Sequence, residues 1–436
     1  MNTYNQVKKY LDSFINYEKK VFFKYKKNLK LKRVKFLLSS LDINYKDLRV
    51  FHIAGTKGKG STAVYCANIL AKSGFTVGLY TSPHFFDFRE RIQILEKDKK
   101  YLIPEEDVIR IVKEIKPVLE RLRFTKKFGK LSFFEVYTAI GFKYFIEKKV
   151  DFVVLETGLG GRLDATNVVL PLVSIITHIG YDHMDKLGYT LKEIAYEKAG
   201  IIKKNTPTVS TIQSKDALRV LKEKCREKKS KFFLLNRDFF IENIRMKKDF
   251  SIFDFRFNGY CLKDLKIFMK GKAQIENASL AVMSILIIKD RFSFDFNIKD
   301  GLMESFIEGR FEVFKKDPLI ILDVAHNPSS FSVLSENIEF YYPNKKIILI
   351  FAASKDKDVK NMLNKINAQK IILTTFSNPR SIPPEEILKN IKLNTIVEKD
   401  LKKAIELAKK IYKKNNLILI SGSLFLVSDA KRYLQN

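Results

Sequence analysis

Apolar and polar residues alternate along the chain in two kinds of block. The segments 48–55 and 150–156, and the one that begins at Val173, are apolar runs that end in polar or glycine-rich turns, which is typical of buried strands. Between the first two, residues 61–73 place apolar side chains at helical spacing, and Gly74 ends that stripe. Strands that alternate with helices in this way predict a parallel α/β sheet.

A further helix in this half has a recognisable start. Ser132 precedes an amphipathic pattern that runs to Phe145, and Glu135 follows at the spacing of a capping box. We therefore expect the helix to begin just after Ser132.

The second half of the chain carries a pattern of its own. A helical stretch over 273–288 and a short helix before Gly309 lead into strands separated by helical segments. These strands are 319–323, 346–351, 370–375 and 417–420. We predict a second, smaller α/β layer. Because 436 residues exceed one ordinary core, we divide the chain into domains at 1–307 and 308–436.

Composition narrows the class of protein. Hydrophobic residues make up 46% of the chain, which is enough for globular packing, and the N-terminus lacks the apolar block of a signal peptide. No apolar run reaches the ~20 residues that span a bilayer. The three cysteines are scattered, which is typical of a reducing compartment. We expect a soluble, cytoplasmic protein.

The net charge of +31 raises the question of nucleic-acid binding, because clustered lysine and arginine bind phosphate backbones. The lysines, however, are spread along the chain together with abundant Phe, Ile, Asn and Tyr, and this favours a general compositional bias. The densest basic run, 19–35, fits either a solvated face or a rim that attracts an anionic substrate.

The candidate chemistry begins at the turn after the first strand. A glycine-rich loop between a strand and a helix is the setting of a phosphate-binding site, because backbone N–H groups at a helix N-terminus carry positive partial charge. A plain tight turn also accommodates the glycines, but it has no need of a lysine between two of them. We predict a nucleotide site made of Gly55, Thr56, Lys57, Gly58, Lys59, Gly60 and Ser61.

Polar residues also follow the next strands. Glu156 opens a loop with three glycines, and a second polar cluster follows the strand that begins at Val173. Ligands gather at the carboxyl ends of parallel strands, and a carboxylate there is a natural magnesium ligand. The side chains of interest are Arg162, Asp164, Asn167, His178, Asp182, His183 and Asp185, with Glu197 and Lys198 on a following helix.

Together these segments resemble a known family. The motifs GTKGKGS, TSPH, ETGLGGRLDATN, DHMDKLG, EKAGI, GRFE and DVAHNP occur in the order found in folylpolyglutamate synthases and dihydrofolate synthases of the Mur ligase superfamily. The resemblance runs from about Leu48 to the ISGSLFLV segment near the C-terminus. It implies an α/β protein with an N-terminal P-loop-type parallel-sheet ATPase domain and a smaller C-terminal Rossmann-like α/β domain.

The resemblance implies an ATP-dependent ligase that joins a folate carboxylate to the amine of L-glutamate. The γ-phosphate of ATP converts the carboxylate to an acyl phosphate, and the amine then displaces phosphate, so the protein mainly positions anions and stabilises charge. Catalytic roles are implied for Lys59, Lys198 and His326.

The same resemblance assigns binding residues. ATP would contact the 55–61 loop together with Asn277, Arg310 and Asp323. Two magnesium ions would be held by Ser82, Glu156, His183 and a carbamylated Lys198. The folate would contact Ser132, Phe133, Phe134, Glu135, Leu163, Asp164 and Ala165. Magnesium prefers oxygen ligands, so the assignment of His183 depends on the resemblance alone. For Lys198 an ion pair with a neighbour such as Glu197 is the alternative.

Two alternatives are less favoured. Another Mur-type ligase would carry a further N-terminal domain, for which the residues before Gly55 leave no room. A nucleotide-switched nucleic-acid-binding protein would need a clustered basic face. Within the family, Asn28 stands where an acidic residue is common in bifunctional members, which weakens the case for dihydrofolate synthase activity. We expect a monomer that acts on small molecules and binds neither nucleic acid nor membrane.

Overall fold

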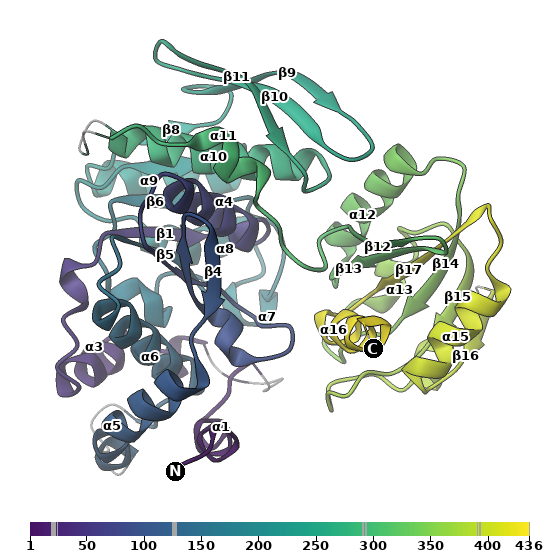
Figure 1. Cartoon of the computed structure of the whole chain (residues 1–436), viewed down its shortest axis with the longest axis horizontal. Coiled ribbons are helices and arrows are strands. Elements are labelled where there is room, and N and C mark those ends of the chain that lie inside the picture. The colour runs from purple at the N-terminus through teal and green to yellow at the C-terminus, as the bar shows by residue number, and fades with distance from the viewer. Residues whose placement is uncertain are drawn as a thin grey trace. The chain divides into compact units, whose positions relative to one another are not determined.

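The structure is a computed structural model of the chain, and it describes all residues except 19–22, 24, 124–128, 290, 291, 293, 390, 392, 393 and 436. Part of the basic run 19–35 therefore lies outside the described residues. The contacts within the chain divide it into two compact units (Figure 1). The first comprises 1–268 and 272–306, and the second comprises 269–271 and 307–436. The predicted bounds, 1–307 and 308–436, treat the first unit as unbroken, whereas the short segment 269–271 groups with the second.

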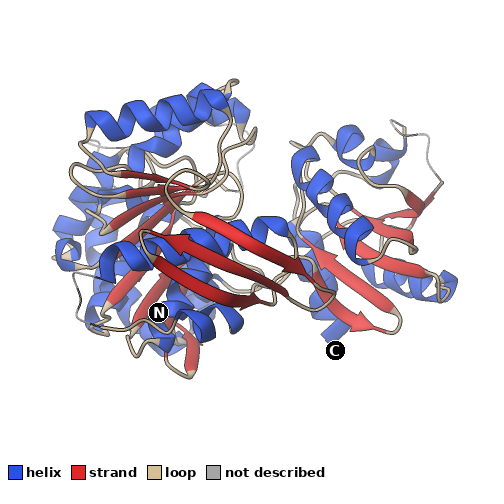
Figure 2. Cartoon of the chain, turned by 90° about the horizontal axis from the view of Figure 1, so that it is seen from above, coloured by secondary structure: helices blue, strands red, loops and turns tan. Residues whose placement is uncertain are grey.

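Among the described residues, an eight-stranded sheet forms the centre of the first unit, in the order β4-β3-β2-β5-β1-β6-β7-β8. The six strands β2, β5, β1, β6, β7 and β8 are parallel, whereas β3 pairs antiparallel with β2, and the edge strand β4 pairs antiparallel with β3. Figure 2 shows the sheet between layers of helices, and this explains why the central strands are apolar throughout. The strands are β1 Val50–Ala54, β2 Val77–Tyr80, β3 Ile92–Glu96, β4 Lys99–Leu102, β5 Phe152–Glu156, β6 Val173–Ile176, β7 Thr208–Ser210 and β8 Phe232–Leu234.

The helices of the first unit follow the predicted pattern with two differences. Helix α4 (Lys59–Lys72) begins two residues earlier than the apolar stripe suggested, because the loop turns directly into it. Helix α6 (Phe133–Glu147) has the predicted capping box at Ser132, but it is buried on most sides rather than amphipathic. The others are α1 Tyr4–Asp12, α2 Tyr25–Asn28, α3 Leu31–Ser40, α5 Glu105–Arg123, α7 Met184–Leu187, α8 Leu191–Lys198, α9 Lys215–Glu227, α10 Lys272–Lys289 and α11 Ile298–Met303.

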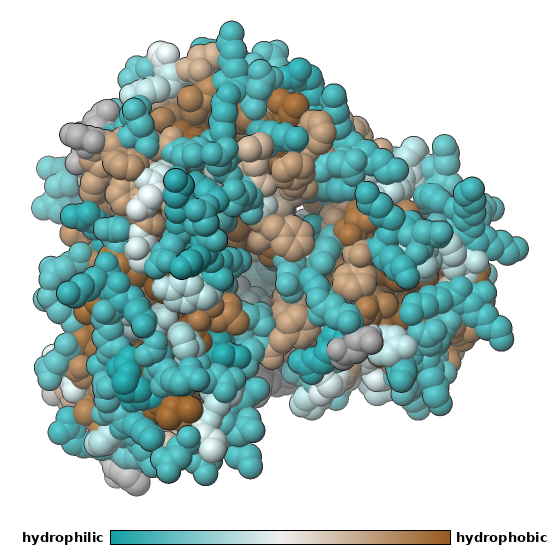
Figure 3. Space-filling model, in the orientation of Figure 1, coloured by the Kyte–Doolittle hydropathy of each residue, from teal (hydrophilic) through white to brown (hydrophobic). Residues whose placement is uncertain are grey.

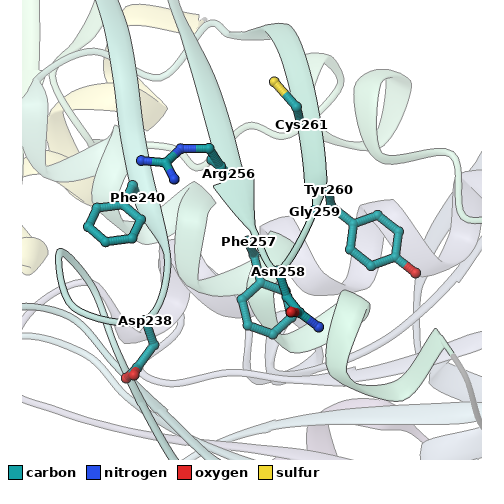
Figure 4. A pocket seen from close by; sticks show the side chains of 8 residues that line it. All are labelled: Asp238, Phe240, Arg256, Phe257, Asn258, Gly259, Tyr260 and Cys261. Carbon is teal, nitrogen blue, oxygen red and sulfur yellow. The ribbon is translucent and has the colours of Figure 1, made fainter.

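A small antiparallel sheet in the first unit was not predicted. It consists of β9 (Phe240–Met246), β10 (Ser251–Phe257) and β11 (Tyr260–Ile267), in the order β11-β10-β9. Figure 1 shows it beyond α10 and α11, and inward-facing residues of β10 such as Phe253 and Phe255 are buried. The hollow in Figure 4 lies at the β10–β11 end of this sheet, and none of its lining residues belongs to the predicted site.

The second unit contains, in the described part of the chain, a six-stranded sheet in the order β12-β13-β17-β14-β15-β16. All pairs are parallel except β12 with β13, so the expected second α/β layer is present with one antiparallel edge. The strands are β12 Glu312–Lys316, β13 Leu319–Asp323, β14 Lys346–Phe351, β15 Ala368–Leu373, β16 Thr395–Val397 and β17 Asn416–Ser421. The helices are α12 Pro328–Tyr341, α13 Val359–Leu363, α14 Pro384–Leu388, α15 Leu401–Ile411 and α16 Leu424–Gln435.

The surface is dominated by polar side chains, as the lysine-rich composition requires. Figure 3 shows hydrophilic residues over most of the visible face, with smaller apolar areas between them. Within the described residues, no helix combines the length and apolar character needed to cross a membrane.

Candidate active site

The predicted phosphate loop connects β1 to α4 and is fixed to the neighbouring loop after β6. The backbone N–H groups of Thr56 and Lys57 donate to the carbonyl oxygen of His178 at 2.8 and 3.2 Å. The Thr56 hydroxyl donates to the carbonyl of Gly180 and accepts from its N–H, at 3.0 and 3.1 Å. These hydrogen bonds define the backbone path of the loop.

Two glycines of this loop are required by close contacts. Gly58 has φ +86°, in the left-handed region, and a Cβ there would collide with the side chain of Asn277 on α10. A Cβ at Gly55 would collide with Thr177. Among the described residues, no side chain caps α4, so the N–H groups of its first turn are available to a ligand. The structure thus brings Asn277 together with the loop.

Glu156 lies beside the loop at the end of β5. The strand pairing sets it next to Ile53 of β1, and its carboxylate is almost completely buried. One oxygen, Oε2, accepts from the backbone N–H of Ser82 at 3.0 Å, and the other, Oε1, lies 3.9 Å from Nζ of Lys59. Three separate elements therefore place Lys59, Ser82 and Glu156 in one cluster.

Lys198, the last residue of α8, reaches the same loop from the other side. Its side chain is buried, and Nζ donates to the carbonyl oxygen of Gly55 at 2.7 Å. Burial, helped by the nearby charge of Lys59, lowers the pKa of Lys198 to about 7. The alternative pairing with Glu197 is not formed, because that carboxylate accepts two hydrogen bonds from Arg162 at 3.0 and 2.9 Å.

His183 follows strand β6, next to Asp182. It precedes α7, its backbone is left-handed with φ 48°, and its side chain is 42% exposed. Its Nε2 is 4.0 Å from Oδ2 of Asp182, and the Asp182 charge acts on Lys198. In the described part of the chain, no group of three or more His, Cys, Asp and Glu side chains is arranged to hold a metal. A magnesium ion here would need other oxygen ligands, such as hydroxyls and phosphates.

The loop after Glu156 is braced from inside. Both oxygens of the buried Asp164 are engaged: Oδ2 accepts from the N–H groups of Gly158 and Leu159 at 2.9 and 3.0 Å, and Oδ1 accepts from the N–H and hydroxyl of Thr166. The Thr166 hydroxyl is also 2.8 Å from Nε2 of the fully buried His52 on β1. Burial lowers the pKa of His52 to about 3, so its ring is neutral.

The role of His52 was not predicted from the sequence, although a polar residue inside an apolar strand was a usable signal.

The neighbours of Asp164 in the predicted folate segment differ in exposure. Leu163 is half-buried, and its N–H is 3.4 Å from the hydroxyl of Tyr25, whereas Ala165 is buried. Asp164 and Ala165 therefore lie inside the loop, where Asp164 holds its backbone.

The other predicted folate segment, Ser132 to Glu135, is mostly internal. The carboxylate of Glu135 accepts from the Ser132 N–H at 2.8 Å and forms a buried ion pair with Arg33 of α3, with N–O distances of 2.7 to 2.9 Å. Phe133 is buried against Tyr137, with ring centroids 4.0 Å apart. Phe134 is partly exposed and lies against the loop, because a Cβ at Gly158 would be 2.7 Å from its ring.

The second unit gathers its three predicted residues at the carboxyl end of β13. Asp323 ends that strand, and its two oxygens accept from the N–H groups of Phe311 and Ala325, each at 2.8 Å. Arg310 is exposed two residues before β12. His326 lies before α12, with Nδ1 2.9 Å from the carbonyl oxygen of Val324.

Comparison with known proteins identifies the class of both domains. Residues 134–285 match the Mur ligase middle domain, and residues 309–424 match the glutamate ligase domain of Mur ligases. Fold and site together define a ligase of the Mur type, and the expected fold class is confirmed.

Relatives over the whole length narrow the class. The chain is 35% identical over 412 residues to a dihydrofolate synthase/folylpolyglutamate synthase of Bacillus subtilis (strain 168), covering 93% of this chain and 95% of that one. The crystal structure of a folylpolyglutamate synthase from Thermotoga maritima is 34% identical, with a TM-score of 0.85 and coverage of 99% and 97%. A folylpolyglutamate synthase complex with AMPPCP and folate is 28% identical and also has a TM-score of 0.85, with complete coverage of both chains. This chain belongs to the folylpolyglutamate synthase/dihydrofolate synthase family.

Proposed function

We propose that this protein is an ATP-dependent ligase that adds L-glutamate to folates through an acyl-phosphate intermediate. The observation that carries the proposal is the cluster of Lys59, Ser82, Glu156 and Lys198 around a preformed phosphate loop. The family supplies the reaction class, and a relative that holds both AMPPCP and folate supports ATP and folate as ligands.

The phosphate groups of ATP would bind at the loop and at the first turn of α4. Gly55 and Gly58 let the loop pass close to Thr177 and Asn277, and the open first turn of α4 offers N–H donors to phosphate oxygens. Lys59 contributes a full positive charge where charge builds up on the transferred phosphoryl group. Ser61 and Asn277 lie at the same loop and would complete the contacts from the first unit.

Magnesium fits the donor set only in part. The carboxylate of Glu156 and the hydroxyl of Ser82 are oxygen ligands of the kind that the ion prefers. When bound, magnesium would neutralise phosphate charge during transfer. We include His183 as a ligand because of the family resemblance, and its half-exposed imidazole is the least suited member of the set.

Carbamylation would turn Lys198 into an additional oxygen ligand. Its neutral amine would attack carbon dioxide, form an N–C bond and release a proton, which leaves an anionic carbamate. The low pKa of this buried lysine supports the step, because a large share of the amine is neutral near pH 7. As an ordinary ammonium, Lys198 would instead repel a cation bound beside Glu156.

The folate would lie on the other side of Glu156, along Phe134 and the loop that Asp164 braces. Phe134 is the member of its segment with a partly exposed ring, which could stack on an aromatic ligand. Ser132, Phe133 and Glu135 would then support Phe134 from inside. Because the family includes both activities, dihydrofolate synthase activity in addition to polyglutamylation is the broader form of the proposal.

The remaining assignments depend on the resemblance. In the second unit, Arg310 and Asp323 would contact ATP, and His326 would act in catalysis. L-Glutamate as the second substrate, the monomeric state, the cytoplasmic location and the absence of nucleic-acid or membrane binding stay predictions.

An assay of ADP release tests the proposal. ATP is supplied with tetrahydrofolate, dihydropteroate and L-glutamate in all combinations, for the wild-type protein, Lys59→Ala and Lys72→Ala. Lys72 is a matched control, since it lies at the other end of α4 and pairs with Asp98 and Glu304 on the surface. We expect ADP release only with a folate and glutamate together, lost in Lys59→Ala and kept in Lys72→Ala. ADP release by Lys59→Ala at the wild-type rate would contradict the assignment of the loop.

A further inference from the structure

The turn before β12 in the second unit has an unusual backbone. Gly309 and Phe311 are both left-handed, with φ 65° and 49°, and Arg310 lies between them. Glycine adopts this conformation readily, but a bulky residue rarely does. A phenylalanine held there points to a constraint imposed by its surroundings, and such constraints concentrate at functional sites.

Hydrogen bonds to both sides hold this turn. The N–H of Phe311 donates to Oδ2 of Asp323 at 2.8 Å, and the carbonyl oxygen of Gly309 accepts from Val324 N–H at 2.9 Å. The N–H of Gly309 donates to Glu312, whose carboxylate is also bonded to the buried Lys431 at 2.7 Å. The backbone on either side of Arg310 is therefore attached to the core of the second unit.

The ring of Phe311 provides a second anchor. It is only 3% exposed, and its centroid lies 5.6 Å from that of Tyr341 and 6.4 Å from that of Tyr342. Both tyrosines are at the end of α12, a helix that begins directly after His326 and Asn327. The same helix thus joins the turn of Arg310 to the segment that carries His326.

Arg310 is exposed between these fixed neighbours. We propose that Phe311 is a positioning residue, whose left-handed backbone and clamped ring present the Arg310 guanidinium to a phosphate group of ATP. The inference rests on the proposed function. A glycine at this position would tolerate the same φ. Without the phenylalanine ring, however, the turn could sample many conformations, and the backbone of Arg310 would no longer hold the guanidinium in one place.

Nucleotide binding by single and double variants tests the inference. Titration with AMPPCP, together with the KM values for ATP and folate, compares Arg310→Ala, Phe311→Gly and the double variant. One charge-assisted hydrogen bond corresponds to a loss of roughly tenfold to a hundredfold in affinity for Arg310→Ala. We expect Phe311→Gly to weaken AMPPCP binding by a similar order with an unchanged KM for folate. The double variant should bind no more weakly than Arg310→Ala alone.

A matched control separates positioning from general damage. Phe331 of α12 is fully buried against Phe351, with a centroid separation of 5.9 Å. Phe331→Leu should therefore lower thermal stability without changing AMPPCP affinity. Strictly additive losses in the double variant, or equal losses of affinity in Phe311→Gly and Phe331→Leu, would overturn the inference. If Arg310→Ala bound AMPPCP as tightly as the wild-type protein, the inference would also be wrong. ATP-dependent ligation by the wild-type protein would still support the proposed function in that case, so the two failures can be told apart.

Discussion

Replacing Glu135 by alanine should destabilise the first unit strongly, although the sequence motif suggested a folate contact. The Arg33 and Glu135 side chains are 5% and 4% exposed and pair through both carboxylate oxygens. Glu135 also completes the capping box of α6 by accepting from Ser132 N–H. Alanine would leave the Arg33 guanidinium buried without its partner and would open the helix start.

The magnitude follows from these two losses. Removing one partner of a buried ion pair costs about 3–5 kcal/mol, and losing a capping interaction costs about 1 kcal/mol. The sum, roughly 4–6 kcal/mol, is a large part of the 5–15 kcal/mol that typically stabilises a domain. The exposed pair of Arg256 and Glu242, 52% and 42% exposed, provides the control, since solvent screens such a pair and Glu242→Ala should leave stability almost unchanged.

Native-state hydrogen exchange is the suitable assay, because a chain with two units need not unfold in one step. Peptides from α3 and α6 should exchange much faster in Glu135→Ala than in Glu242→Ala. The double variant Arg33→Met/Glu135→Met should recover most of the protection, since it removes both buried charges. Equal protection in Glu135→Ala and Glu242→Ala would refute the reasoning. A changed KM for folate at unchanged protection would show that Glu135 contacts the substrate instead.

Four further variants at three positions, and one measurement of pH dependence, probe the phosphate loop and its surroundings. Gly58→Ala should weaken ATP binding and lower thermal stability, because its Cβ would meet Asn277 and its φ is +86°. A titration with AMPPCP and a melting curve measure both effects. Unchanged affinity and melting temperature would contradict the role given to this loop. Lys198→Ala should lose ligation and regain part of it with added formate, whereas Lys198→Arg should stay inactive; a fully active arginine variant would exclude the carbamate. Carbamylation of the wild-type enzyme at a fixed concentration of dissolved carbon dioxide should slow as the pH falls below about 7, where the amine becomes protonated, and a rate independent of pH would contradict this. Thr166→Val should loosen the loop that Asp164 holds and should raise the KM for folate more than the KM for ATP. A larger increase in the KM for ATP would show that this loop serves the nucleotide instead.

Local patterns were sufficient to predict the elements that carry the loop. The apolar run 48–55, the glycines and the helical stripe that follows describe β1, the loop and α4, since each depends on residues close in sequence. Strand β13 begins and ends at the predicted residues for the same reason. Adjacent carboxyl ends of parallel strands then bring Glu156 next to the loop, which the sheet topology makes predictable once the strands are known.

Contacts between distant residues could not be predicted in this way. Arg33 pairs with Glu135 across 102 positions, and nothing in either local sequence specifies the partner. The capping spacing of Ser132 and Glu135 was recognised, but the family motif assigned the same carboxylate to a ligand. The hydrogen bond from Lys198 to Gly55 spans 143 positions and likewise appears only in the folded chain. The small β9–β11 sheet was also missed, although β10 carries a local signal: Phe253 and Phe255 alternate with polar residues, as is typical of a half-buried strand.

The formation of glutamylated folate is the most direct test of the central claim. The purified protein is incubated with ATP, magnesium, tetrahydrofolate and L-glutamate, and the folate product is followed by mass spectrometry together with ADP release. The account predicts that the folate gains a glutamyl residue for each ADP formed, and that neither product appears when ATP or glutamate is omitted or when Lys59 is replaced by alanine. ADP release without any gain in folate mass, or folate elongation that persists in Lys59→Ala, would contradict it.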